Sequence, residues 1–139
     1  MHNILVCDDD RDIVAALKIY LSGGEYRVFE AYNGAEAVEA VRKNDIHLVL
    51  MDIMMPEMNG LELTAKVKSD IEYSHIPVIL LTAKTTLEAK VEGFECGADV
   101  YIEKPFSIRQ LRKQIENLLK LRQAFHKMMV AMGLPLSAR

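Results

Sequence analysis

Hydrophobic positions along the chain gather in five short runs, most of which are continuous rather than alternating with polar residues. The runs lie at Ile4–Cys7, Tyr26–Glu30, His47–Met51, Val78–Leu81 and Asp99–Ile102. A continuous apolar run of this length is typical of a parallel strand that is covered on both faces. The pattern therefore predicts five strands, of which the second alternates enough to lie at the edge of a sheet.

The segments between the runs have the spacing and the end signals of helices. After the first run, Ile13, Leu17 and Leu21 share one helical face, and Ser22–Gly24 ends that helix. A polar residue followed three positions later by Glu or Gln is a further helix-start signal. This signal marks the expected helix starts at Asn33, Asn59, Thr85 and Ser107, whereas the first helix is expected to begin at Asp10, where the helical spacing starts. The helix from Thr85 is expected to end at Gly97.

Strands that alternate with helices predict an α/β fold, in which a parallel sheet is wrapped on both faces. A closed eight-unit barrel typically needs about 250 residues, whereas this chain has 139. The expected fold is therefore an open, doubly wound sheet of five parallel strands with five helices.

Composition narrows the class of protein. With 27% charged residues and a net charge of −3, the chain has the balance of a globular domain and no basic excess for nucleic acid. Cys7 and Cys96 lack the spacing of metal ligands and favour a reducing compartment. The apolar runs are too short to cross a membrane, and no signal peptide is expected before Ile4. We therefore expect a cytoplasmic domain that binds neither nucleic acid nor membrane directly.

Polar residues directly after the apolar runs supply the candidate chemistry, because ligands of open parallel sheets bind beyond the carboxyl ends of the strands. These residues are Asp8 and Asp9, Asp52, Thr82, and Glu103-Lys104-Pro105. Clustered carboxylates repel one another unless a cation is present, and Mg2+ suits an open site with two or three acids. One acid can then act as a nucleophile toward phosphorus while the metal, Lys104 and the Thr82 hydroxyl contact the phosphoryl oxygens.

Four motifs in register resemble one known family. ILVCDDD, LVLMDIMMPEMNG, PVILLTAK and YIEKPF occur in the order and at the separations found in response-regulator receiver domains. The resemblance spans Ile4 to about Leu121, and it implies a flavodoxin-like sheet with the strand order 2-1-3-4-5. The segment from Leu80 to Leu111 looks especially like the receiver modules of hybrid two-component sensors.

The resemblance implies a role for each matching residue. Asp52 is the expected phosphoacceptor, Asp8 and Asp9 are the expected ligands of Mg2+ together with Asp52, and Thr82 and Lys104 are expected to contact the phosphoryl group. The backbone carbonyl of Met54 would complete the metal ligands. The Lys104–Pro105 peptide bond is expected to be cis. Tyr101 has the position of the family's switch aromatic, whose rotamer is coupled to Thr82.

Each candidate residue also has a plain structural interpretation. Asp8 and Asp9 could be acids favoured at the start of a helix, and Asp10 is the expected N-cap. Thr82 could be an ordinary β-branched strand end. Tyr101 could be a half-buried strand tyrosine with no switch role.

Fast dephosphorylation would require side chains near Asp52 that orient water, and the residues at two such positions, Met54 and Lys84, differ from this requirement. Met54 and Lys84 flank the approach of water to a phosphorylated Asp52, and an apolar Met54 side chain cannot orient water. The small Ala83 leaves the approach of the phosphoryl group open. The sequence therefore predicts a phosphorylated state that lasts for minutes or longer.

The expected function is phosphorelay signalling, in which Asp52 accepts a phosphoryl group from a histidine kinase or a phosphotransfer domain. An output domain or protein, DNA-binding in some hybrids, would follow. Such a domain catalyses its own phosphorylation and slow dephosphorylation without being a turnover enzyme, whereas a hybrid parent chain would be a histidine kinase. The alternatives are a pseudo-receiver that docks partners without phosphorylation and a metal-dependent phosphohydrolase, which would need a further acid–base residue.

The C-terminal segment continues the apolar pattern beyond the expected receiver domain, residues 1–121. The roughly heptad positions are Leu111, Ile115, Leu118, Phe125, Met129 and Met132. Residues 122–139 are therefore expected to be a helical extension or the start of a linker. A homodimer seam and a last helix that overruns and then frays remain as alternative interpretations.

Overall fold

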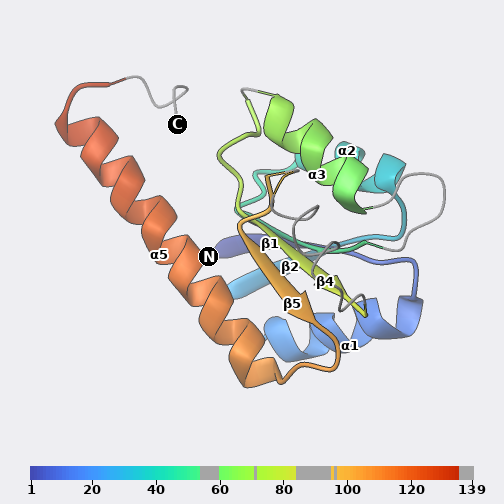
Figure 1. The fold of residues 1–139 in the computed structure, drawn as a ribbon. Coiled ribbons are helices and arrows are strands. Elements are labelled where there is room, and N and C mark those ends of the chain that lie inside the picture. The colour runs from blue at the N-terminus through green and yellow to red at the C-terminus, as the bar shows by residue number, and fades with distance from the viewer. Residues whose placement is uncertain (54–59, 71, 84–94, 96, 135–139) are drawn as a thin grey trace.

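The computed structural model describes residues 1–53, 60–70, 72–83, 95 and 97–134 of the chain. The strands and helices follow one another along the chain (Figure 1) as β1 (His2–Cys7), α1 (Arg11–Leu21), β2 (Tyr26–Ala31), α2 (Gly34–Lys43), β3 (Leu48–Asp52), α3 (Gly60–Ser69), β4 (Val78–Thr82), β5 (Val100–Glu103) and α5 (Ile108–Ala131).

The five strands pair in parallel in the order β2-β1-β3-β4-β5. The predicted doubly wound sheet and its strand order are therefore confirmed. β3 and β4 each extend one residue beyond the predicted runs, so that Asp52 and Thr82 are the last residues of their strands. The helix expected from Thr85 to Gly97 lies almost entirely outside the described residues, which contain four helices.

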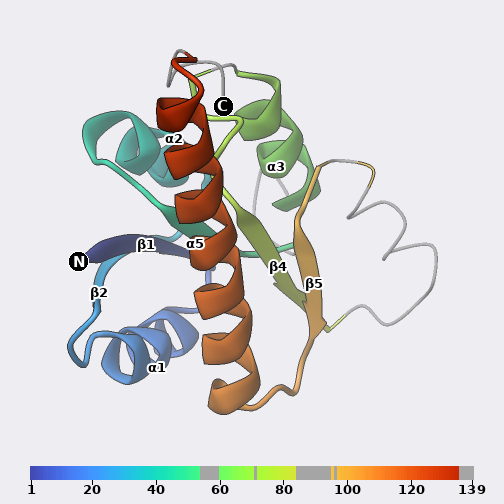
Figure 2. The ribbon, with the colours of Figure 1, turned by 90° about the vertical axis from the view of Figure 1, so that its left-hand side faces the viewer.

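Helices cover both faces of the sheet (Figures 1 and 2). Helices α2 and α3 lie on one face with α1 and the first half of α5 on the other. In β3, Val49 and Met51 pack on the α2–α3 side, whereas Leu48 and Leu50 pack on the α1–α5 side. Because successive side chains of a strand point to opposite faces, a strand covered on both faces must be apolar throughout. This is the reason that the runs are continuous.

Side-chain caps fix where the helices begin. The Asp10 carboxylate accepts hydrogen bonds from the backbone N–H groups of Asp12 and Ile13, at 3.0 and 3.3 Å. Asn33 accepts one from the Glu36 N–H at 2.9 Å, and Ser107 one from the Gln110 N–H at 3.0 Å. These bonds satisfy N–H groups that have no partner within the helix. The predicted starts at these three caps are confirmed.

Helix α5 is much longer than the sheet requires. Its buried residues Leu111, Ile115 and Leu119 pack on the sheet, and its C-terminal half projects past the amino ends of the strands (Figure 1). The boundary predicted at residue 121 falls inside this helix, and the division into two segments stays a prediction. No helix among the described residues has the length and hydropathy needed to span a membrane.

His47 joins β1 to the segment before β3 at the amino edge of the sheet. Its Nδ1 accepts a hydrogen bond of 2.8 Å from the Asn3 N–H, and its Nε2 lies 3.2 Å from Asp45 Oδ2. The ring of His2 packs edge-on against the ring of His47, with 5.4 Å between centroids. Burial lowers the pKa of both histidines, and the Arg122 guanidinium lowers the pKa of each further. Both shifts favour the neutral form of the imidazole, although Asp45 opposes the shift at His47.

Acidification is expected to destabilise the fold through His47. Its folded pKa lies below the unfolded value of about 6.5, so the unfolded state binds more protons at mildly acidic pH. The stability contributed by neutral His47 is fully present above pH 6.5 and is lost as the pH falls toward the folded pKa. His47→Gln should therefore lose less stability than the wild type between pH 7.5 and 5.5, as measured by urea unfolding. Equal losses in the two chains would contradict this role.

Candidate functional site

The register of the sheet brings two acids together. Cys7 at the end of β1 pairs with Met51 of β3, so that the next residues, Asp8 and Asp52, lie side by side where the strands end. Asp52 in turn pairs with Leu81 of β4, and Thr82 pairs with Glu103 of β5. The carboxyl ends of four strands therefore meet at the position where open parallel sheets bind ligands.

Three carboxylates form a compact group at this edge. Asp8, Asp9 and Asp52 each offer an oxygen atom, and these atoms all lie within 4.8 Å of one another. The Asp8 side chain is 4% exposed and the Asp52 side chain is 12% exposed, whereas Asp9 is exposed to solvent. Among the described residues, this is the one group of three or more potential metal ligands that are so close together.

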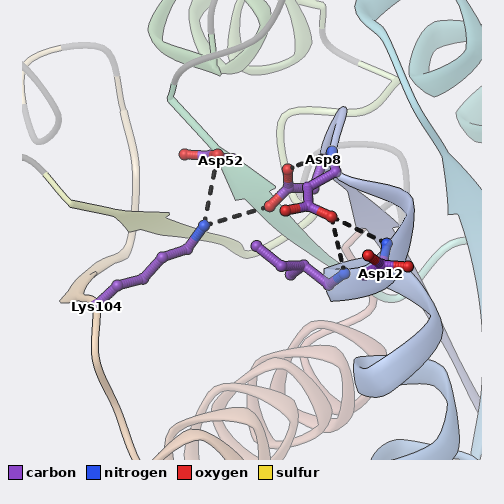
Figure 3. Close-up of polar contacts among 6 residues, drawn as sticks. Asp8, Asp12, Asp52 and Lys104 are labelled. Atoms are coloured by element: carbon purple, nitrogen blue, oxygen red, sulfur yellow. Dashed lines mark hydrogen bonds and ion pairs between the residues drawn. The ribbon is translucent and has the colours of Figure 1, made fainter.

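Lys104 supplies a positive charge from the opposite side of the site (Figure 3). Its Nζ atom lies 3.3 Å from Asp8 Oδ2 and 3.5 Å from Asp52 Oδ2. One ammonium opposed to three carboxylates leaves a net charge of −2 in the group. The peptide bond between Lys104 and Pro105 is cis, the isomer that the resemblance implies.

The pKa of the Asp8 carboxyl group reflects its burial and the dense negative charge around it. Burial raises the pKa of Asp8 above its ordinary value, and the neighbouring Asp52 raises it further. The Asp10 N–H, which donates to Asp8 Oδ1 at 2.9 Å, and the Lys104 ammonium oppose this rise. A divalent cation with oxygen ligands would remove the repulsion. The donor set therefore fits a Mg2+ site formed by Asp8, Asp9 and Asp52.

The structural interpretation of the first acids is less well supported than the site interpretation. Asp10 caps α1, and Asp8 directs one oxygen to the Asp10 N–H while the other faces Lys104. Asp8 is buried and pairs with Lys104, which directly follows β5, so its role is not limited to the helix terminus. Cys7 is not a competing nucleophile, because burial and the nearby acids raise the pKa of its thiol to about 12.

The structure describes only some of the remaining predicted site residues. Tyr101 of β5 pairs with Leu80 and is half-buried against the α2–α3 side of the core. Ala83 is exposed directly after β4. The Thr82 side chain, Met54 and Lys84 lie outside the described residues, so their predicted roles stay predictions.

Gly60 is a site-supporting residue whose role the sequence pattern did not indicate. Its N–H donates to the Ile53 carbonyl at 2.8 Å, which closes the segment after β3. A Cβ at this position would lie 2.3 Å from the Asp52 carbonyl oxygen and 2.9 Å from Ile53 Cα. The buried Thr64 hydroxyl also donates to the Gly60 carbonyl at 2.7 Å. The helix start predicted at Asn59 gives no indication of a contact between Gly60 and the backbone of Asp52.

A parallel sheet in this order, with an acidic group and a lysine at its carboxyl edge, defines a flavodoxin-like fold with an acidic site. The family model of the response regulator receiver domain matches residues 4–116 of the chain. The chain belongs to the response regulator receiver domain family.

Longer proteins contain similar segments. The chain is 43% identical over 119 residues to histidine kinase P4 of Formosa agariphila, covering 86% of this chain and 9% of that kinase. It is 41% identical over 123 residues to the transcriptional regulatory protein SrrA of Staphylococcus aureus, covering 88% of this chain and 50% of that regulator. The chain therefore spans half or less of the length of these relatives.

Solved structures of receiver domains match nearly the whole chain. A CheY-like receiver domain protein from Methanospirillum hungatei superposes with a TM-score of 0.83 at 31% identity, over 89% of this chain and 98% of that one. The receiver domain of a signal transduction histidine kinase from Syntrophus aciditrophicus gives a TM-score of 0.81 at 33% identity, over 86% and 91%. These matches confirm the fold and the family suggested by the four motifs.

Gly60→Ala is expected to destabilise the domain by about 1–3 kcal/mol, because the added methyl group overlaps backbone atoms that cannot move aside. Urea unfolding measures the effect. Gly23→Ala is the matched control, since a Cβ there meets nothing within 4 Å. Equal stabilities of the two variants would show that the segment after β3 adjusts freely.

Proposed function

We propose that Asp52 accepts a phosphoryl group from a phosphohistidine of a kinase or of a phosphotransfer domain. The observation that carries this proposal is the pairing of Lys104 with both Asp8 and Asp52 at the end of β3. The Asp52 carboxylate, the Lys104 ammonium and the acids Asp8 and Asp9 lie close together, which supports Asp52 as the nucleophile. Membership of the receiver family supports the same reaction.

In the proposed step, a carboxylate oxygen of Asp52 attacks the phosphorus atom. A new O–P bond forms while the P–N bond to the histidine breaks, and the departing imidazole nitrogen keeps the electron pair and takes up a proton from solvent. Lys104 can move from the Asp52 carboxylate to the transferred oxygens with little displacement, since its Nζ already lies 3.5 Å from Asp52 Oδ2.

The acids at this edge are the proposed ligands of Mg2+. Asp8, Asp9 and Asp52 supply carboxylate oxygens, and the Met54 carbonyl is the proposed fourth protein ligand. A bound Mg2+ supplies charge neutralisation for the incoming phosphoryl group.

Phosphorylation is proposed to shift a two-state equilibrium at the face formed by the helix expected from Thr85 to Gly97, by β5 and by α5. The added negative charge would attract the Thr82 hydroxyl, and Tyr101 would change rotamer to fill the space. Tyr101 is half-buried beside the strand that ends at Thr82, which supports this coupling.

The chain is proposed to act as a module of a longer cytoplasmic two-component protein, a hybrid sensor kinase or a regulator with an output domain. Residues 122–139 would then form a helical extension or linker toward the next domain. The similar segments in a kinase and in a transcriptional regulator support both arrangements. A DNA-binding output would belong to that next domain or to a partner.

Phosphorylation by a small-molecule donor is the decisive test. Incubation with phosphoramidate and Mg2+ should add one phosphate to the wild type, and intact-mass measurement should find none in Asp52→Asn. The control Asp12→Asn removes an exposed acid in the first turn of α1 and should leave the adduct intact. Chelation of Mg2+ should slow the reaction by roughly tenfold or more.

The outcomes separate the alternatives. A wild-type chain that gains no phosphate would be a docking module that works without phosphorylation. Continuous release of phosphate with turnover would instead indicate a phosphohydrolase. A single stable adduct on Asp52 supports the proposed function.

The lifetime of the adduct tests the roles of Met54, Ala83 and Lys84. The wild type should stay phosphorylated for minutes or longer, because the Met54 side chain cannot orient an attacking water. Met54→Asn should shorten the lifetime by roughly tenfold or more, because the amide can orient the attacking water. This is less than the full effect that a positioned acid–base group has on a reaction rate. Met128→Asn, on the exposed end of α5, is the control. Loss of the wild-type adduct within seconds would refute the idea.

A further inference from the structure

The position of Lys104 depends on where β5 lies along β4, because Lys104 directly follows β5. With four residues, β5 is the shortest of the described strands, and among them it pairs with β4 alone (Figure 2). Its ladder runs from the pair of Ile79 with Val100 to the pair of Thr82 with Glu103. A short strand at the edge of a sheet has few backbone bonds to fix its register. Contacts beyond this ladder therefore matter for where β5 ends.

Asp99 supplies two such contacts directly before β5. Its backbone N–H donates a hydrogen bond of 2.9 Å to the carbonyl of Val78, the first residue of β4. Its Oδ2 atom accepts a hydrogen bond of 2.8 Å from the Val78 N–H. A shift of β5 by one residue along β4 would break both bonds. Asp99 therefore fixes the register of β5 from its amino end.

Lys68, in the last turn of α3, holds the Asp99 side chain in this position. Its Nζ atom lies 3.0 Å from Asp99 Oδ2 and donates to the carbonyls of Ile76 at 2.7 Å and Ser74 at 3.3 Å. An ammonium has three N–H donors, so these three acceptors can use all of them. The Lys68 side chain is 17% exposed, and a Cβ added at Gly97 would lie 3.0 Å from its Cγ atom. Lys68 therefore joins α3 to the segments that directly precede β4 and β5.

We propose that Lys68 and Asp99 are positioning residues for phosphoryl transfer, and that they place Lys104 at the site by fixing the register of β5. We call Lys68, Asp99 and Val78 the β5 anchor. The inference rests on the proposed function of Asp52, because it concerns the role of Lys104 in that reaction. The β5 anchor lies at the amino edge of the sheet and Asp52 at the carboxyl edge, so the anchor acts on the reaction only through β5.

The geometry at Lys104 makes its contacts sensitive to the register of β5. Its Nζ atom lies 3.3 Å from Asp8 Oδ2 and 3.5 Å from Asp52 Oδ2 (Figure 3), near the outer limit for hydrogen bonds. One residue of a strand spans about 3.3 Å. A displacement of β5 by a fraction of one residue would therefore move the ammonium away from one acid or from both.

The acids of the proposed metal site do not depend on the β5 anchor in this way. Asp8 and Asp9 follow β1 and Asp52 ends β3, and these two strands pair with each other. Loss of the anchor should therefore lower the rate that Lys104 supports without weakening the binding of Mg2+. A network that only stabilises the fold would produce no such difference between the two quantities.

The Mg2+ dependence of phosphorylation of the full chain by phosphoramidate tests the proposal. Asp99→Asn and Lys68→Met should each lower the rate at saturating Mg2+ roughly tenfold, and neither should raise the Mg2+ concentration that gives half of that rate. Lys66→Met is the matched control, since Lys66 is an exposed lysine of the same helix. Circular dichroism checks that each variant is folded. Rates of Asp99→Asn and Lys68→Met equal to that of Lys66→Met would overturn the proposal, as would a loss that appears only as weaker Mg2+ binding.

Removal of Lys104 shows whether the β5 anchor acts through this residue. Asp99→Asn should slow phosphorylation much less in a Lys104→Ala chain than in the wild type, because the group that the anchor positions is already absent. Equal fold losses in the two backgrounds would show that Asp99 acts in another way and would overturn the proposal.

Nuclear magnetic resonance of Lys104 gives a readout that needs no phosphoryl transfer. In a chain labelled with 13C-lysine, the Lys104 Cε signal is identified by its loss in Lys104→Arg. This signal should move in Asp99→Asn and stay in place in Lys66→Met. An unmoved signal in Asp99→Asn would overturn the positioning role. A wild type that takes up no phosphate would instead contradict the proposed function of Asp52, so that the two failures are distinguished.

Discussion

The parallel pairing of β1 with β3 is the constraint on which the site depends. It aligns the ends of two buried strands, so that Asp8 and Asp52 lie next to each other. Lys104 reduces the repulsion without cancelling it, and the pKa of Asp8 stays above its ordinary value. The fold itself brings carboxylates together that repel one another. Such a group is well suited to bind a cation, because binding relieves this repulsion.

Much of the fold could be predicted from the chain because its signals are local. Continuous apolar runs, caps such as Asp10 and Asn33, and acids directly after strands each depend on a few neighbouring residues. The strand order is not local, and it came from the resemblance to receiver domains. The identity of the acids in the site could be predicted by the same reasoning, since the carboxyl ends of parallel strands share an edge.

The features that could not be predicted are those that arise from packing in three dimensions. The close approach of Gly60 to the Asp52 carbonyl depends on how α3 packs against the sheet, and a helix-start signal does not contain that information. The heptad pattern in the C-terminal segment mixed two faces of α5. Only burial separates Leu111 and Ile115, which pack on the sheet, from Phe125, which lies outside it.

The bridge from Lys104 to Asp8 also bears on how the chain folds. It joins residues 96 positions apart, and the bridge to Asp52 spans 52 positions. Contacts of such high sequence separation form only after the intervening chain has been ordered, since closing long loops is entropically costly. A partly folded chain without β5 would lack the Lys104 ammonium beside Asp8 and Asp52. The charge balance at the carboxyl edge therefore depends on the last strand having joined the sheet.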